Sequence, residues 1–202
     1  MWAKSSKGFT IVELLIVIVI IGIIATIISV AYSGLTQRAN NTKTASAVNA
    51  YKKALIQYAT INRVYPANST YCLGEGYPSG CGSNGGNAEN VTVNNLLRPY
   101  MGNAAKLPLP STKAVPYISS IPRTGAWFSY FASATLDGIS HPWFLMYMMD
   151  GHQKKCEAAP VASFSPFGTF SSTPPASGYS ETYSGQGGGT FCVVALPNPA
   201  TL

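Results

Sequence analysis

The chain has 202 residues, of which 47% are hydrophobic and only 10% are charged. Soluble domains carry about 25% charged residues, so this composition excludes a charge-rich coiled coil or a disordered acidic tail. The formal net charge is +6. The basic residues are scattered, however, and this pattern is weak evidence for a nucleic-acid partner.

The first predicted element is an apolar N-terminal segment. Residues 1–8 form a short leader with two lysines, Lys4 and Lys7, and residues 9–32 contain a single charged side chain, that of Glu13. About 20 apolar residues in a helix cross the hydrocarbon core of a bilayer. We therefore expect residues 9–32 to span a membrane. The leader lysines should stay on the cytoplasmic side, which leaves the rest of the chain outside.

Three fates are open to this segment. It can remain a plain anchor, or it can be cut as a signal peptide near Ala31-Tyr32-Ser33. It can also be cut between Gly8 and Phe9, which keeps the apolar helix on the mature chain. Glu13 favours the third fate, because a carboxylate in an apolar span is costly and neither an anchor nor a signal peptide uses it. After this cut Phe9 gains a free ammonium group, four residues from Glu13.

Glu13 itself has two interpretations. The simpler one is that its carboxylate caps the N-terminus of the helix, where the helix dipole favours a negative charge. The other is that it pairs with the Phe9 ammonium of a neighbouring subunit. In an apolar medium such a pair would set the register between helices packed side by side.

The segment Lys7-Gly8-Phe9-Thr10-Ile11-Val12-Glu13-Leu14-Leu15 resembles the processing site of type IV prepilins and type II secretion pseudopilins. The resemblance covers residues 1 to about 60. It implies that a membrane-embedded aspartyl peptidase cuts after Gly8 and N-methylates Phe9, and that Glu13 guides subunit addition. One departure is Val30, which stands where many family members carry a helix-bending proline.

The helical pattern continues beyond the apolar segment. Val48, Tyr51, Leu55 and Tyr58 are spaced as one apolar stripe of an amphipathic helix. Proline is absent from residue 9 to residue 65, and Pro66 ends the pattern. We expect one helix over 9–62, with a membrane or filament-core half at 9–32 and an amphipathic half at 33–62. Residues 63–202 would form an extracellular head.

Strand signals follow in the head. Residues 127–136 and 143–149 flank the turn dipeptide Asp137-Gly138, and residues 191–196 form a third apolar run. Residues 91–100 fit either a short helix or a strand. We predict an α+β fold in which a small antiparallel sheet packs on the amphipathic half of the helix, burying one face of each. The resemblance implies this type IV pilin-like architecture as well.

Four cysteines, Cys72, Cys81, Cys156 and Cys192, lie beyond the apolar segment. Their spacing does not fit a zinc or thioredoxin site, and an exported head favours two disulfides over four buried thiols. Three connectivities are possible. We favour Cys72–Cys81 with Cys156–Cys192, because sequential pairing closes the shorter loops. The second bridge would bracket a loop-rich surface segment at 160–190.

No enzyme motif emerges from the chain. His141 and His152 lack a nucleophile nearby in sequence, and the acidic residues form neither a pair nor a calcium loop. We therefore expect no catalysis, no metal and no cofactor. Glycosylation patterns begin at Asn40, Asn68 and Asn90, and none is assigned.

The resemblance implies a structural pilin, a subunit of a surface filament for adhesion, motility or DNA uptake. Its expected partners are further copies of the chain, membrane lipid before assembly, the prepilin peptidase and methyltransferase, and a pilus assembly platform. It would lie in the cytoplasmic membrane first and in an extracellular pilus afterwards. Binding to DNA or to a host surface is possible but unsupported. Phosphate binding needs clustered cations, and the cations of this chain are spread out. The alternatives are a pseudopilin of a secretion or competence machine, and a membrane-anchored binding domain that never polymerises.

Overall fold

The computed structural model describes residues 8–83, 86–116, 122–151, 154, 156, 163–164, 169–171 and 188–202. The leader lysines, His152 and most of the predicted 160–190 loop lie outside these residues. The chain divides into two compact units, residues 1–37 and 38–202. The second unit forms the globular head.

Helix α1, Ile11–Asn62, is continuous from the apolar segment into the head. Its first part is long and apolar enough to cross a membrane. Helix α1 contains no proline, and it continues through the weak helix formers Gly22 and Gly34. The helix ends where predicted: Arg63 adopts a left-handed φ of 60°, and its N–H bonds the carbonyl of Ala59 at 2.8 Å.

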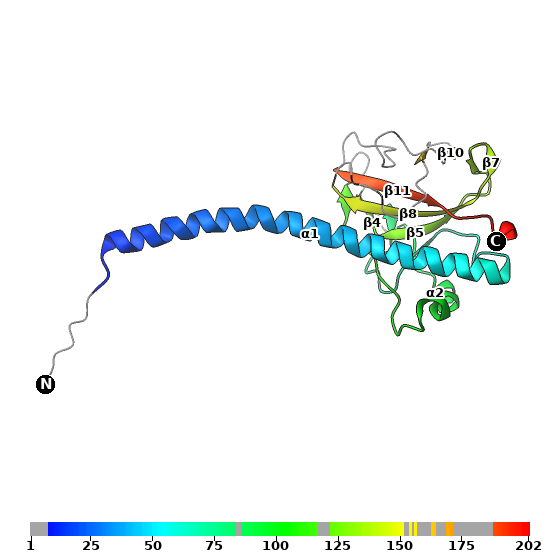
Figure 1. The fold of residues 1–202 in the computed structure, drawn as a ribbon, viewed down its shortest axis with the longest axis horizontal. Coiled ribbons are helices and arrows are strands. Elements are labelled where there is room, and N and C mark those ends of the chain that lie inside the picture. The colour runs from blue at the N-terminus through cyan, green and yellow to red at the C-terminus, as the bar shows by residue number, and fades with distance from the viewer. Residues whose placement is uncertain are drawn as a thin grey trace. The chain divides into compact units, whose positions relative to one another are not determined.

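The head is built on a four-stranded antiparallel sheet. Its strands are β1 (Tyr71–Cys72), β5 (Ala126–Tyr130), β8 (Trp143–Asp150) and β11 (Gly189–Ala195), in the order β1-β5-β8-β11. β8 lies in the middle and pairs along its length with β11. Figure 1 shows the second half of α1 lying along this sheet. The fold is therefore the α+β, pilin-like arrangement that the sequence predicts.

The helix and the sheet share one hydrophobic core. Val48, Tyr51 and Leu55 of the predicted helical stripe are completely buried, and they belong to one cluster with Phe128 and Tyr147 of the sheet. Burying a side chain of this size contributes about 1.5–3 kcal/mol. The period of the stripe thus fixes which face of α1 contacts the sheet.

The opposite face of the sheet is also buried, a feature that the sequence analysis does not predict. Trp127, Met146, Met148 and Phe191 form a second cluster with Val115. A small sheet helps to cover this face, built from β2 (Gly82–Ser83), β4 (Pro122–Thr124) and β3 (Val115–Pro116) in that order. Because both faces are covered, β5 reads as a nearly continuous buried run.

The predicted strand over 127–136 is two strands. β5 stops at Tyr130, and a turn closes with a 2.9 Å bond from the N–H of Ala134 to the carbonyl of Phe131. β6 (Thr135–Leu136) and β7 (Ile139–Ser140) then form a hairpin through Asp137 and Gly138, both with positive φ. The dipeptide is thus a turn, as predicted. β6 and β7 join β10 (Thr169–Ser171) and β9 (Ser163–Phe164) in a separate sheet.

Of the two options for residues 91–100, the structure forms a helix. α2 (Val91–Leu97) begins after Asn90, whose side chain accepts a 3.1 Å bond from the N–H of Val93. This cap supplies the start signal that the weak propensity of the segment lacks. The 3₁₀ helix η1 (Arg98–Met101) follows at once, and a second, η2 (Pro199–Thr201), lies near the C-terminus.

Candidate functional site

The start of α1 is closed by a reciprocal pair of residues, Thr10 and Glu13. One carboxylate oxygen of Glu13, Oε2, accepts bonds of 2.8 Å from both the backbone N–H and the hydroxyl of Thr10. In return, the N–H of Glu13 donates to the hydroxyl oxygen of Thr10 at 3.2 Å. This is a capping box, with Thr10 at the N-cap and Glu13 three residues later. The simpler interpretation of Glu13, a cap on its own helix, is thus present in the structure.

Gly8 and Phe9 precede this cap in non-helical backbone. The side chain of Phe9 is 84% exposed, and nothing lies within 4 Å of where a side chain on Gly8 would begin. The bond between them is therefore open to an enzyme on all described sides. Gly8 and Phe9 therefore lie just before the capped start of the helix that carries Glu13. Thr10 is a site residue that was not predicted, although the spacing Thr-x-x-Glu is the signature of this cap.

A long apolar surface follows the cap. Every described side chain from residue 8 to residue 36 is exposed, and most of them are Ile, Leu or Val. A soluble monomer rarely exposes an apolar patch of this extent, which marks a membrane-facing or protein-facing surface. Glu13 is the charged group at one end of it. The site therefore combines an exposed Gly8–Phe9 segment, a positioned carboxylate and an apolar helix.

Two disulfides close loops in the head. Cys72 is bonded to Cys81 and Cys156 to Cys192, with Cα–Cα distances of 5.6 and 5.7 Å. This is the sequential pairing that the sequence analysis favours. Cys192 lies on the central sheet and Cys72 on its edge strand, so both bridges tie irregular segments to the sheet.

Two acidic residues of the head are engaged in structural contacts. Glu75 forms an ion pair with Arg98, and its second oxygen accepts a 2.9 Å bond from the N–H of Leu107. Asp150 pairs with Lys113. These pairs hold the long connections between α1, α2 and the sheet in place, and neither of the two carboxylates is paired with a nucleophile in the described residues.

His141 packs against the rings of Trp143 and Phe144, at centroid distances of 6.4 and 5.2 Å. Burial lowers the pKa of its imidazole, and hydrogen bonds to the backbone of Leu196 and Trp143 oppose this effect. The ring is therefore neutral at neutral pH. Its position between aromatic rings fits a packing role.

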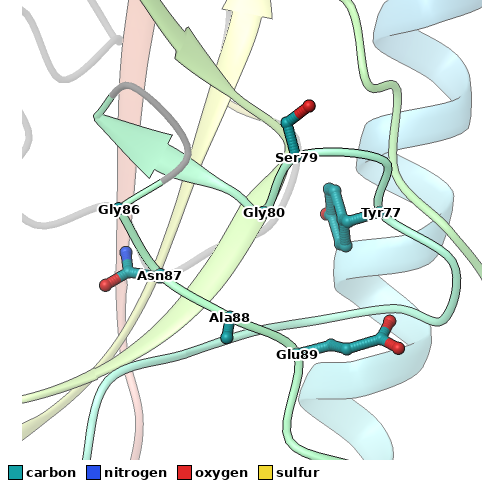
Figure 2. A pocket seen from close by; sticks show the side chains of 7 residues that line it. All are labelled: Tyr77, Ser79, Gly80, Gly86, Asn87, Ala88 and Glu89. Atoms are coloured by element: carbon teal, nitrogen blue, oxygen red, sulfur yellow. The ribbon is translucent and has the colours of Figure 1, made fainter.

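A hollow of about 280 Å³ lies beside the Cys72–Cys81 loop. It is lined by Tyr77, Ser79, Gly80, Gly86, Asn87, Ala88 and Glu89. Figure 2 shows the side chains of Asn87 and Glu89 extending in opposite directions from one segment of chain. The Tyr77 hydroxyl donates to the Leu73 carbonyl, and the Glu89 carboxylate accepts from the Gly76 N–H. The Tyr77 and Glu89 side chains that line the hollow are therefore bonded to neighbouring backbone groups.

Comparison with known proteins agrees with the geometry at the start of α1. Residues 3–29 match the family model of the prokaryotic N-terminal methylation motif. The chain is also 38% identical over 64 residues to a fimbrial protein of Neisseria meningitidis serogroup A / serotype 4A. That match covers 32% of this chain and 38% of the relative, so the chain spans less than two fifths of the relative's length.

No solved structure matches the chain. The N-terminal motif, the partial likeness to a fimbrial protein and the fold nevertheless agree with one another. A long helix with an apolar start, packed on a four-stranded antiparallel sheet, is the pilin-like arrangement. The chain therefore carries the prokaryotic N-terminal methylation motif at residues 3–29, resembles a fimbrial protein over 64 residues, and has a pilin-like α+β fold.

Proposed function

We propose that the chain is a pilin, the structural subunit of a type IV pilus-like filament. It is inserted in the cytoplasmic membrane by α1, cut after Gly8, N-methylated at Phe9 and polymerised through its N-terminal helix. The observation that carries this proposal is the positioned carboxylate of Glu13 at the head of an otherwise apolar, exposed helix.

The capping box explains how Glu13 serves in both states of the subunit. The Thr10 bonds satisfy one carboxylate oxygen, Oε2, so the charge is partly stabilised while the helix stands in lipid. The carboxylate retains a second oxygen with lone pairs of its own. The new ammonium group of a neighbouring Phe9 is the natural partner for that oxygen, because opposite charges attract strongly in a medium of low dielectric constant.

The same apolar surface serves both stages of assembly. Lipid covers the helix before assembly, and the helices of neighbouring subunits replace the lipid in the filament core. The N-terminal methylation motif supports processing by a prepilin peptidase and methyltransferase. The partial likeness to a fimbrial protein supports assembly into a surface filament. A pseudopilin would share the motif, and it would differ in filament length and in its partner machine.

The first test is mass spectrometry of the N-terminal peptide, on filaments sheared from cells that produce the chain. We expect a peptide that begins at N-methylated Phe9, in a fraction of high molecular weight. A start at Gly34 would identify a secreted monomer with a conventional signal peptide. A chain that starts at Met1 or Trp2 and stays in the membrane would identify an unprocessed anchor, and either result contradicts the proposal.

The second test is Glu13→Ala, compared with Glu89→Ala in the head as a matched loss of one carboxylate. We expect the Glu13 variant to be cut after Gly8 but to yield few filaments, because the carboxylate acts in assembly. The Glu89 variant should assemble normally. Normal filaments from the Glu13 variant would remove the proposed mechanism.

A further inference from the structure

A short loop in the head, residues 66–70, is held at both ends by buried tyrosines. Before the loop, the hydroxyl of Tyr65 donates a 2.7 Å bond to the carbonyl of Pro197. After the loop, the ring of Tyr71 stacks on Phe128 with centroids 4.9 Å apart. Tyr65 and Tyr71 are 5% and 2% exposed, whereas every residue between them is half-buried or exposed. The two anchors therefore fix the points at which this loop leaves the core and returns to it.

The outer part of this loop carries the sequence Asn68-Ser69-Thr70. All three residues are exposed, and their backbone belongs to no helix or strand. In the part of the chain that the structure describes, neither the carboxamide of Asn68 nor the hydroxyl of Thr70 has a hydrogen-bond partner. Asn-x-Ser/Thr, with any residue but proline in the middle, is the acceptor pattern for N-linked glycans. Both side chains that define the pattern are thus free at the surface.

The same pattern at Asn40-Asn41-Thr42 lies inside helix α1. Successive residues of a helix are about 100° apart around its axis, so the side chains of Asn40 and Thr42 point to nearly opposite faces. The residue between them is also held, because the side chain of Asn41 bonds both backbone groups of Asp150. An enzyme that acts on the asparagine and contacts the hydroxyl two residues later would have to unwind the helix here.

The third pattern, Asn90-Val91-Thr92, forms the start of helix α2. The carboxamide oxygen of Asn90 accepts a 3.1 Å bond from the N–H of Val93, so this side chain caps the helix. Thr92 lies in the first turn of α2. Loss of such a cap costs about 1 kcal/mol, and an enzyme that bound the Asn90 carboxamide would compete with the cap. Of the three patterns, Asn68 is therefore the one that an enzyme can bind without disturbing the fold.

We propose that Asn68 is the attachment site of an N-linked glycan and that Thr70 supplies the hydroxyl that the glycosyltransferase recognises. This inference rests on membrane insertion in the proposed function, which places the head outside the membrane. The glycan donor is an oligosaccharide carried on a polyprenyl diphosphate, a lipid that can present the sugar on that side.

The transfer is a substitution at the anomeric carbon of the donor sugar. Nδ2 of Asn68 forms a bond to this carbon while the bond from the carbon to the diphosphate oxygen breaks. The polyprenyl diphosphate leaves with the electron pair of that bond, and one proton of Nδ2 passes to a base of the transferase. Nothing is oxidised or reduced, and the loop keeps its two tyrosine anchors.

Peptide mapping of filaments sheared from cells that produce the chain tests the assignment. After the disulfides are reduced and alkylated, trypsin together with a glutamate-specific protease places the three patterns on separate peptides, Ala39–Lys43, Val64–Glu75 and Asn90–Lys106. We expect the mass of a glycan on Val64–Glu75, and fragmentation that retains the glycan should locate it on Asn68. The other two peptides should have their unmodified masses.

Substitutions distinguish an N-linked glycan from one attached to a hydroxyl group. Asn68→Gln and Thr70→Ala should each abolish the added mass, whereas Thr70→Ser should keep it, because serine also fits the pattern. Ser69→Ala is the matched control, since it removes a hydroxyl from the same exposed loop and should keep the glycan. The three altered positions are exposed, so the fold and the cut after Gly8 should be unchanged.

The outcomes separate the two proposals. Filaments that start at Phe9 and carry the glycan on Asn68 support the assignment. Filaments that start at Phe9 with an unmodified Val64–Glu75 peptide, or with an added mass that survives Asn68→Gln, overturn the assignment and leave the proposed function standing. An uncut chain that stays in the membrane contradicts the proposed function, and its own Val64–Glu75 peptide then decides the assignment by the same two criteria.

Discussion

The side chain of Asn41 bonds both backbone polar groups of Asp150. Its Oδ1 accepts a 2.7 Å bond from the Asp150 N–H, and its Nδ2 donates a 2.9 Å bond to the Asp150 carbonyl. The two residues lie 109 positions apart in the chain. Asn41 belongs to α1 and Asp150 is the last residue of β8, so one side chain ties the helix to the end of the central strand.

Replacing Asn41 by Ala should destabilise the head. The change leaves a partly buried N–H and a carbonyl without their partner, and each unsatisfied group costs about 1–3 kcal/mol. We expect a fall in the free energy of unfolding within or above that range. Denaturant unfolding of the detergent-solubilised chain, followed by tryptophan fluorescence, measures it. Asn68→Ala, at an exposed bend, is the control and should have little effect. An equal effect of the two changes would contradict the role of Asn41.

Thr10→Val should weaken assembly without preventing processing. The change removes the hydroxyl that bonds Glu13 and accepts from the Glu13 N–H, while the backbone N–H of residue 10 remains. Loss of an N-cap costs about 1 kcal/mol. We expect fewer filaments and an intact cut at Gly8. Thr10→Ser restores the hydroxyl and should restore the yield. Failure of Ser to rescue would indicate that shape, and not the capping bond, matters at this position.

The two disulfides should differ in their contribution to stability. The Cys156–Cys192 bridge closes a loop of sequence separation 36, and the Cys72–Cys81 bridge one of 9. Chain entropy predicts about 4 kcal/mol for the longer loop and about 3 kcal/mol for the shorter one. Pairwise Cys→Ala variants, unfolded in denaturant, provide the comparison. A larger loss from the shorter loop would show that local packing outweighs loop closure.

The stability of the head should fall as the pH drops through the range in which histidine titrates. Burial between Trp143 and Phe144 lowers the pKa of His141 below its ordinary value. Between the lowered pKa and the unfolded value near 6.5, the unfolded chain binds more protons at this site, so the free energy of unfolding decreases with falling pH. Below the lowered pKa, His141 is protonated in both states, and it no longer makes the free energy of unfolding depend on pH. His141→Gln should flatten this slope between about pH 5 and 7, as unfolding at several pH values would reveal.

The sequence predicts the helix and the central strands because their patterns depend on local chemistry. The stripe through Val48, Tyr51 and Leu55 has the helical period and is buried as that period requires. The Asp137-Gly138 dipeptide forms a turn because both residues tolerate positive φ. These features are visible in a window of a few residues.

The second buried face of the sheet is not visible in this way. It depends on β2, β4 and β3, which are only two or three residues long, and β2 pairs with β4 across some 40 positions. Such strands carry no periodicity of their own. The end of β5 at Tyr130 was missed for a related reason: the aromatic run continues through Phe131, and only tertiary pairing of Tyr130 with Trp143 shows where the strand stops.

At the candidate site, the sequence predicts a cleavage point between Gly8 and Phe9 and singles out the acidic residue, but it does not predict their geometry. Glu13 is conspicuous because it is charged within an apolar stretch. Thr10 is inconspicuous because threonine is common, and its role appears only once the helix is known to begin at Ile11. The same holds for Asn41, which nothing local distinguishes from its neighbour Asn40.

The position of the cap has a consequence for the timing of assembly. The first described helical bond of α1 joins Leu14 to Thr10, so the bond between Gly8 and Phe9 lies before the helix begins. A cut there breaks no helical hydrogen bond and leaves the fold as it was. In the proposed processing, the cut removes the leader with Lys4 and Lys7 and leaves an ammonium group on Phe9, four residues from a carboxylate already held in place. In the proposed function, cleavage therefore prepares the subunit for assembly without breaking any described hydrogen bond of α1.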